Sequence, residues 1–410
     1  MTDYPLLTPE TAADHVRSRP ALAGRIDPDA LVSVREIGDG NLNLVFVLVD
    51  ATGRGLVLKQ ALPYVRLVGP SWALTPDRAR HEAEALRLHG ALAPGLVPEL
   101  LDYDPERFVL AIEDLSDHTV WRTALNDGLR HGGVAAAMGR YVAAVAFGTS
   151  VIGMDAGERA RTLAGAVNPE LCLITEDLVF TEPYVDAGRN SVLPSNESDA
   201  AELAADQYMV AEMGRAKWAF MTRAEALVHG DLHTGSVMVR GDGETDGGVA
   251  DSAKAFDSEF AFYGPVAFDL GALWANYVIA AARATALGDD DRAAWALGLC
   301  GETWTAFEAE FRGSWERRVD PRMFRDDLRE HLLATWRSEA WLFAAAKMSR
   351  RIVGLAKTTD IETLPAELRE GAARGVLRTA RRWVRERHAD AEPERAQEIA
   401  GEVIVSTRTG

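Results

Sequence analysis

The sequence predicts an α+β (α/β) fold in two lobes, a small antiparallel sheet that carries one helix and then a larger, mainly helical part. Short strand-like runs separated by turn residues fill the first 115 residues, and long segments with helical periodicity dominate the remainder. A chain of 410 residues also exceeds the size of a typical single core. We therefore expect an N-terminal lobe over residues 1–115 and a C-terminal lobe over residues 116–410.

The N-terminal lobe is expected to start with an amphipathic helix over Thr8–Leu22, because Thr8 can cap it and Pro9 suits the first helical position. Alternating apolar residues bounded by Gly, Asp and Pro predict the strands that follow. These strands are Val32–Ile37, Leu44–Val49, Gly55–Lys59, Val97–Tyr103 and Phe108–Glu113. A strongly helical segment, Asp77–Leu88, lies between the third strand and the fourth.

The C-terminal lobe shows helical periodicity over most of its length. The expected helices are Val134–Ser150, Glu197–Met213, Trp218–Ala226, Val266–Ala286, Arg292–Phe311, Phe324–Ile352 and Ala372–Arg387. Between the third and fourth of them, the Gly-rich stretch Gly241–Gly248 is expected to join two short strands as a surface loop.

The composition predicts a soluble, cytoplasmic protein. Asp and Glu number 62 against 44 Lys and Arg, and the resulting net charge of −18 argues against binding to nucleic acid or to anionic membranes. Cys172 and Cys300 are the two cysteines, which makes a disulfide framework or a zinc site improbable. The polar N-terminus is unlike a signal peptide, and no uncharged apolar run of about 18 residues is present.

The segment LVHGDLHTGSVM, Leu227–Met238, places Asp231 in a tight turn after an apolar, strand-like lead. Asp257 and Glu259 follow in FDSEFAFYGP, and in an extended segment their i, i+2 spacing puts both carboxylates on one face. One carboxylate to orient a hydroxyl nucleophile and two oxygen ligands for Mg²⁺ are the minimum equipment for phosphoryl transfer from ATP. These residues predict an ATP-dependent kinase for a small hydroxyl compound.

Four neighbours of these carboxylates have less definite roles. His229 is expected to be structural, because Asp231 already supplies the base. His233 either contacts substrate or stabilises the turn by a hydrogen bond. Ser236 stands five residues after Asp231, where protein kinases carry a metal-binding Asn, so metal binding is expected to depend on the later acidic pair. Asp269 either caps a helix or braces the catalytic loop.

In the N-terminal lobe, GDGNLNLVF at Gly38–Phe46 has the character of a phosphate-covering loop or of an ordinary hairpin turn. Lys59 ends the next strand, where a cation can reach the α- and β-phosphates, or be simply solvated. Glu82 on the following helix can hold Lys59 as an ion pair, with Glu84 as a competing partner.

Glu113, Asp114 and Leu115 follow an apolar strand at the expected boundary between the lobes. In bilobal kinases the backbone at this place hydrogen-bonds the adenine edge, so the tripeptide is a candidate hinge; a plain strand terminus is the alternative.

Arg350 and Arg351 lie in KMSRRIVGLA on a long predicted helix. Adjacent helical arginines usually face solvent. In so acidic a chain, a cationic pair flanked by apolar residues is more typical of a site that holds phosphate charge.

Together these segments resemble the methylthioribose kinase family, within the aminoglycoside phosphotransferase and choline kinase-like group of protein-kinase-like folds. The resemblance runs over most of the chain. The HGD and D-x-E elements are shared with the wider group. The loop GPSWALT (Gly69–Thr75), HTGS, EFAFYGP and the twin arginines are particular to this family.

The resemblance implies a bilobal protein-kinase-like fold that uses ATP and Mg²⁺ to convert 5-methylthioribose into 5-methylthioribose 1-phosphate, a step of methionine salvage. It also implies a homodimer. The residues that it implies are Asn43, Lys59, Glu113, Asp114 and Leu115 for ATP, with Glu82 through its ion pair, Asp257 and Glu259 for Mg²⁺, Asp231 as the base, and Trp72, Arg350 and Arg351 around the substrate and its developing phosphate charge.

Two departures from the family pattern are present. Ser258 stands between the metal-binding residues and Ala73 follows the loop Trp, where the family usually has Pro. Because Pro fixes φ, we expect a looser backbone at both places. Two other functions remain possible from the residues alone: an aminoglycoside or other sugar or alcohol phosphotransferase, and a nucleotide-binding pseudokinase scaffold, against which the complete set of Lys59, Asp231 and the acidic pair argues.

Overall fold

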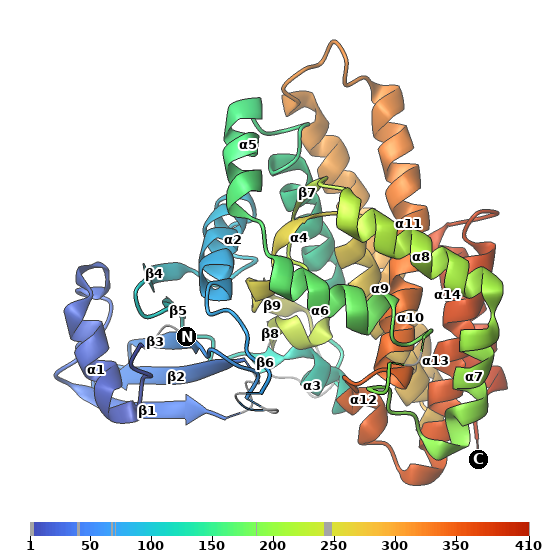
Figure 1. Cartoon of the computed structure of the whole chain (residues 1–410), viewed down its shortest axis with the longest axis horizontal. Helices are drawn as coiled ribbons and strands as arrows, with labels where there is room; N and C mark the ends of the chain where they lie inside the picture. The colour runs from blue at the N-terminus through green and yellow to red at the C-terminus, as the bar shows by residue number, and fades with distance from the viewer. Residues whose placement is uncertain are drawn as a thin grey trace.

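The computed structural model describes residues 4–38, 42–66, 69, 71–185, 187–241 and 248–409. Figure 1 shows the N-terminal strands and helix α1 at one end of the molecule and the long helices of the C-terminal part at the other. The fold is α+β, with an antiparallel sheet near the N-terminus followed by a mainly helical part, as the sequence predicts. In the part of the chain that the structure describes, no helix has the length and apolar character needed to cross a membrane.

The N-terminal sheet has the strand order β1-β2-β3-β5-β4, and every neighbouring pair is antiparallel. Its elements are α1 (Pro9–Ser18), η1 (Pro20–Leu22), β1 (Leu31–Ile37), β2 (Asn43–Asp50), β3 (Gly55–Ala61), α2 (Arg78–Leu92), β4 (Leu100–Asp104) and β5 (Val109–Glu113). Helix α1 covers one face, where Ala12 shares a buried cluster with Phe46 and Leu58. Helix α2 packs against β3, β4 and β5. Because side chains alternate along a strand, Lys59 points away from the α1 side.

The strands β4 and β5 begin later than predicted. The predicted start of β4 includes Pro98, which has no N–H to donate to the ladder, and pairing begins at Leu100. Phe108 has a positive φ of 52° and belongs to the turn, so β5 begins at Val109.

The C-terminal part is built from helices and two small sheets. Its helices are α3 (Trp121–Asn126), α4 (Val134–Gly148), α5 (Ala156–Gly165), α6 (Pro169–Phe180), η2 (Pro194–Asn196), α7 (Glu197–Ala205), α8 (Gln207–Thr222), η3 (Thr234–Ser236), η4 (Ser258–Phe260), α9 (Ala267–Ala286), α10 (Asp290–Ser314), η5 (Trp315–Arg317), α11 (Asp326–Val353), α12 (Thr359–Glu362), α13 (Ala366–Glu386) and α14 (Pro393–Ser406). Its strands are β6 (Thr119–Val120), β7 (Ala226–Val228), β8 (Val237–Gly241), β9 (Ala250–Ala255) and β10 (Phe262–Gly264). Strand β7 pairs with β10, and β8 pairs with β6 and β9. The two strands that flank the Gly-rich stretch are thus present, although residues 242–247 lie outside the described part.

The predicted helices Glu197–Met213 and Trp218–Ala226 are wrong in their limits. Asp206 has an extended backbone and accepts a hydrogen bond from the Met209 N–H, so it ends α7 and caps α8. Helix α8 then runs through Trp218 to Thr222, and Ala226 already belongs to β7. Helices α3, α5, α6, α12 and α14 were not predicted.

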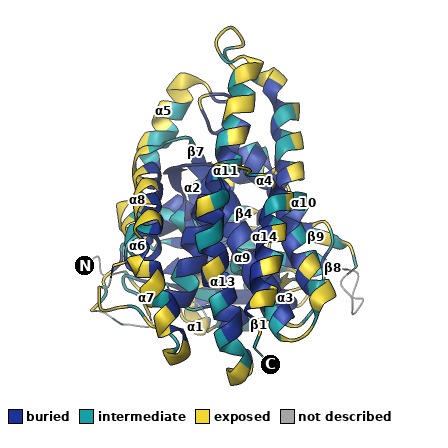
Figure 2. Ribbon diagram, turned by 90° about the vertical axis from the view of Figure 1, so that its right-hand side faces the viewer, coloured by how far each residue is buried: buried dark blue, intermediate teal, exposed yellow. Residues whose placement is uncertain are grey.

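Helix α9 forms the centre of the C-terminal core. All its residues except Arg283 and Ala286 are buried, and it packs against α10, α11 and α13. Figure 2 shows it among buried segments behind the outer helices. A helix that is buried on almost every side is stable only when other elements enclose it in this way, and α9 therefore gives the residues on it a fixed position.

His89 ties three elements together and gives stability a pH dependence. Its Nε2 lies 2.9 Å from the Leu227 carbonyl, which can only accept, so Nδ1 accepts from the Tyr141 hydroxyl at 2.8 Å. Burial lowers the pKa of His89 from 6.5 to about 3. Below pH 6.5 the unfolded chain therefore binds a proton at His89 that the folded chain does not bind. The contribution of His89 to the free energy of unfolding is complete above that pH and falls below it.

We expect His89→Gln to remove the contribution of His89 from the pH dependence of the unfolding free energy. Between about pH 5.5 and 4 the unfolding free energy should fall less steeply than in the wild type, by about 1.4 kcal/mol per pH unit. Urea titrations at several pH values would measure both slopes. Equal slopes would mean that His89 is not the buried neutral group described here.

Candidate active site

Asp231 is held at the end of β7 by a braced loop. Asp269 on α9 accepts hydrogen bonds from the N–H groups of His229, at 2.7 Å, and of Gly230, at 3.1 Å. Gly230 has a φ of 84°, and a Cβ at this residue would lie 2.2 Å from the Phe260 carbonyl oxygen. Of the two roles predicted for Asp269, bracing is the one observed, since its side chain does not cap α9.

Three nitrogen-bearing side chains surround the Asp231 carboxylate. Lys347 Nζ lies 2.7 Å from Oδ1, and Arg350 Nη1 lies 3.9 Å from the same oxygen. His233 Nε2 lies 3.4 Å from Oδ2. Burial alone would raise the pKa of Asp231, but the positive charges of Lys347 and Arg350 bring it well below the usual value. The carboxylate is therefore ionised and ready to accept a hydrogen bond.

His233 and Ser236 stabilise the loop that carries Asp231. The Ser236 hydroxyl donates to the Asp231 carbonyl at 2.9 Å and lies 2.9 Å from His233 Nδ1. Burial lowers the pKa of His233 to about 3, so the ring is neutral. The hydrogen bond predicted for His233 in the turn is present, and its Nε2 also lies 3.4 Å from the Asp231 carboxylate.

Lys59 joins the sheet to the helical part of the site. Its Nζ lies 2.7 Å from a Glu82 oxygen and also contacts Asp257. Glu84 instead pairs with Arg80, so the structure selects Glu82 from the two predicted partners. Burial would lower the pKa of Lys59, but the charges of Asp257 and Glu82 raise it above its usual value. Lys59 therefore remains a cation inside the cleft.

Three carboxylates next to Lys59 can hold a metal ion. One oxygen from each of Glu82, Asp257 and Glu259 lies within 4.8 Å of the others. Such a set of hard oxygen ligands fits Mg²⁺. Asp257 has a positive φ of 67° and the 3₁₀ helix η4 follows it, so its carboxylate and that of Glu259 are brought together by a turn and not by the extended segment that the sequence predicted. Its side chain is 44% exposed, so it is the carboxylate most open to a ligand.

Glu259 is also fixed by donors from β2 and α2. Its Oε2 accepts from Asn43 Nδ2 at 3.0 Å and from Arg78 Nε at 3.2 Å. Arg78 is fully buried and donates to the carbonyl oxygens of Leu42 and Thr75 as well. Asn43 was predicted to contact ATP, and among the described residues its side chain donates to Glu259 and so orients that carboxylate. Residues 39–41 of the predicted phosphate-covering loop lie outside the described part.

The candidate hinge follows β5 directly. Glu113 forms an ion pair with Lys254 at 2.7 Å. Asp114 packs so closely on Gly55 that a Cβ there would lie 2.2 Å from its Oδ2. Leu115 is buried. The Glu113 side chain is therefore engaged within the protein, and so are its N–H, which donates to the Glu99 carbonyl at 3.0 Å, and the Leu115 carbonyl, which accepts from the His118 N–H at 2.9 Å.

Comparison with known proteins identifies the family. The model of the phosphotransferase enzyme family matches residues 33–297. A methylthioribose kinase from Yersinia pseudotuberculosis serotype O:1b is 38% identical over 383 residues, which cover 90% of this chain and 91% of that one. Another, from Citrobacter koseri, is 37% identical over 384 residues, covering 92% and 93%. The chain belongs to the methylthioribose kinase family. A choline/ethanolamine kinase family protein from Mesorhizobium loti, known from its crystal structure, has a TM-score of 0.43 at 15% identity, covering 96% of this chain and 99% of that one.

The twin arginines expected of a methylthioribose kinase occupy different environments. Arg350 approaches Asp231, and no residue in the described part accepts a hydrogen bond from its buried Nε. Arg351 instead donates through Nη1 to the carbonyl oxygen of Lys357 at 3.2 Å, beyond the end of α11. The geometry assigns the first arginine to the site and the second to the turn that follows the helix.

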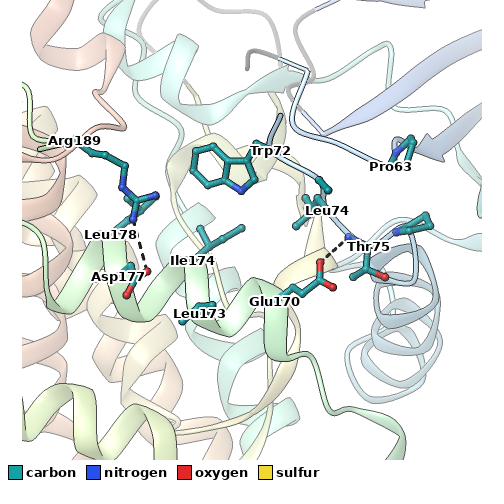
Figure 3. A pocket seen from close by; sticks show the side chains of 12 residues that line it. Pro63, Trp72, Leu74, Thr75, Glu170, Leu173, Ile174, Asp177, Leu178 and Arg189 are labelled. Atoms are coloured by element: carbon teal, nitrogen blue, oxygen red, sulfur yellow. Dashed lines mark hydrogen bonds and ion pairs between the residues drawn. The ribbon is translucent and has the colours of Figure 1, made fainter. Parts of the chain in front are cut away.

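Trp72, in the loop particular to methylthioribose kinases, lines a cavity of about 580 Å³ against α6. Figure 3 shows its ring facing Arg189 across this cavity, and the guanidinium carbon lies 5.7 Å from the ring centre. The loop is tied to α6 where Thr75 N–H donates to Glu170 at 2.7 Å. Neither Asp231 nor the twin arginines are among the described residues that line this cavity. In this conformation, therefore, Trp72 does not share a cavity with Asp231.

Two residues of the site were not predicted, Lys347 and Arg78. Lys347 stands three residues before Arg350 on α11, a spacing that puts both on one helix face. That spacing was the available signal. Nothing local in the sequence distinguishes Arg78 from the other arginines of its helix.

Proposed function

We propose that this chain transfers the γ-phosphoryl group of ATP to the anomeric hydroxyl of 5-methylthioribose, giving 5-methylthioribose 1-phosphate and ADP. The observation that carries the proposal is the pairing of an ionised Asp231, 2.7 Å from Lys347, with a separate group of three carboxylates beside Lys59. One group suits a hydroxyl nucleophile, and the other suits the metal and phosphates of a nucleotide. The sugar itself comes from the relatives that bear the name methylthioribose kinase.

In this proposal Asp231 accepts the proton of the attacking hydroxyl. Lys59, held by Glu82, binds the α- and β-phosphates. The backbone at Glu113–Leu115 hydrogen-bonds the adenine. This segment is then the hinge between an N-terminal lobe, residues 1–115, and a C-terminal lobe, residues 116–410. Arg350 offers a cation to the transferring phosphoryl group. Mg²⁺, when bound, neutralises phosphate charge, and Asp257 and Glu259 would hold it with Glu82 nearby.

We expect Asp257→Asn to raise the Mg²⁺ concentration that gives half-maximal activity, because Asp257 is the most exposed carboxylate of the cluster. Its melting temperature should stay near the wild-type value. Glu259→Gln should raise the Mg²⁺ requirement too, and should also lower the melting temperature, since it weakens a buried acceptor of Arg78 and Asn43. Ser236→Ala is the matched control, because its hydroxyl is used within the loop. Unchanged Mg²⁺ titrations in both carboxylate variants would rule out the proposed metal site.

The substrate is tested by measuring ADP release with methylthioribose, kanamycin, choline and homoserine in parallel. We expect methylthioribose to give the highest kcat/KM and a product phosphorylated at the anomeric carbon. Preference for kanamycin or choline would reassign the chain to another branch of the phosphotransferases. Nucleotide binding without turnover of any compound would favour the scaffold. In the proposed role the enzyme is a homodimer that serves methionine salvage, and light scattering in solution would test the assembly.

A further inference from the structure

Lys347 on α11 directs its ammonium group at the Asp231 carboxylate. The side chain is 5% exposed, and Nζ lies 2.7 Å from Oδ1. On its other side Nζ lies 4.5 Å from the ring centre of the fully buried Phe268. A desolvated ammonium is costly unless it is paired, and Asp231 supplies the pairing charge. This contact joins α11 directly to the catalytic loop.

We propose that Lys347 is a positioning residue for the Asp231 base, and that it decides which carboxylate oxygen receives the substrate proton. The inference deepens the proposed kinase function and rests on it. Oδ1 is occupied by Lys347, and Arg350 Nη1 is 3.9 Å from the same oxygen. Both cations are thus nearest to Oδ1, whereas Oδ2 lies 3.4 Å from His233 Nε2.

The contacts of the loop leave Oδ2 open to the substrate. The Ser236 hydroxyl donates to the Asp231 carbonyl, because a carbonyl oxygen can only accept. His233 Nδ1 lies 2.9 Å from the same hydroxyl, whereas its Nε2 lies 3.4 Å from Oδ2, beyond the usual length of an N–H···O hydrogen bond. The substrate hydroxyl is the donor that Oδ2 can take.

In the reaction, the substrate hydroxyl donates to Oδ2 while its oxygen forms a bond to the γ-phosphorus. The bond from that phosphorus to the β,γ-bridging oxygen breaks, ADP leaves with the electron pair, and the proton passes to Oδ2. Lys347 stays protonated throughout and acts only through Asp231. Because the transition state of phosphoryl transfer is loose, the orientation of the base matters more than its basicity.

A double-mutant cycle tests this role. We expect Lys347→Met to lower kcat about 10²-fold, the scale of a misplaced catalytic group, with little change in the KM for ATP. In an Asp231→Asn background the same substitution should change kcat by less than about threefold, since its target is already lost. Lys347→Arg keeps the charge and should recover part of the activity. Lys217→Met, at an α8 lysine that bonds Thr181, is the control and should match the wild type.

The outcomes separate this inference from the function on which it rests. Equal losses from Lys347→Met in both backgrounds, or wild-type kcat in the single variant, would overturn the positioning role. A fall in kcat that Lys347→Arg does not relieve, together with a large rise in the KM for ATP, would also overturn it, by placing Lys347 at the nucleotide. If Lys347→Met does not fold, the cycle is run with Lys347→Arg and the same criterion of non-additivity. Absence of methylthioribose turnover in the wild type would instead overturn the proposed function.

Discussion

Asp231→Asn should lower kcat by roughly 10²–10⁴ and leave ATP binding nearly intact. A carboxylate accepts the proton of the attacking hydroxyl, whereas the amide of the same shape does not. Lys59 and the three carboxylates beside it are unaffected by the change, so the nucleotide site keeps its charges. The amide oxygen can still accept from Lys347, so the fold should survive.

Single-turnover kinetics and nucleotide titration would measure the two properties separately. Asp251→Asn provides the control, because Asp251 pairs with Arg240 on the surface of β9. We expect this control to keep the wild-type kcat. An Asp231→Asn enzyme with normal turnover would mean that another group accepts the proton, and both the base and its positioning by Lys347 would have to be abandoned.

Local sequence signals were enough wherever neighbouring residues decide the structure. Thr8 caps α1 as predicted, since its side chain accepts from the Thr11 N–H. The turn between β2 and β3 was equally clear, because Asp50 accepts hydrogen bonds from the N–H groups of Thr52 and Arg54. The division between α7 and α8 was not predictable in the same way. Asp206 caps α8 and is paired with Arg381 and Arg385 on α13, contacts that depend on packing.

The choice between Glu82 and Glu84 shows where sequence reasoning about the site stops. Both stand on α2, but residues two apart on a helix point in different directions. Which of them meets Lys59 depends on how α2 lies against β3, and this is set by burial over the whole lobe. The sequence restricted the partner to two residues, and the structure selects one.

Lys347 and the orientation of the Trp72 loop illustrate what the sequence alone could not predict. Lys347 meets Asp231 across 116 residues of chain, and an isolated helical lysine more often faces water. The Trp72 loop was predicted from resemblance, but its direction follows from distant contacts with Glu170 and Arg189. Long-range contacts such as these are visible only once the helices are packed.

The twin arginines were treated alike in the sequence, and the structure gives them unlike partners. Arg350 lies beside Asp231. Burial lowers the pKa of Arg350 below its usual value, although the charge of Asp231 acts in the opposite direction. Arg351 bonds the backbone of the turn after α11. An arginine that binds carbonyl oxygens contributes to stability, whereas one with unused donors beside the base is suited to phosphate.

We therefore expect Arg350→Ala to lower kcat about 10³-fold or more, because an arginine at the transferring phosphoryl group stabilises charge that develops only in the transition state. Arg350→Lys keeps the charge without the planar fork and should be intermediate. Arg351→Ala should also lose activity, but with a fall in melting temperature that Arg350→Ala does not share. Arg378→Ala on the exposed side of α13 is the control. Steady-state kinetics with methylthioribose and thermal melts of all four variants separate these effects. Wild-type kcat in Arg350→Ala would mean that Arg350 does not act on the transferring phosphoryl group, and a stable, inactive Arg351→Ala would move the phosphate contact to the second arginine.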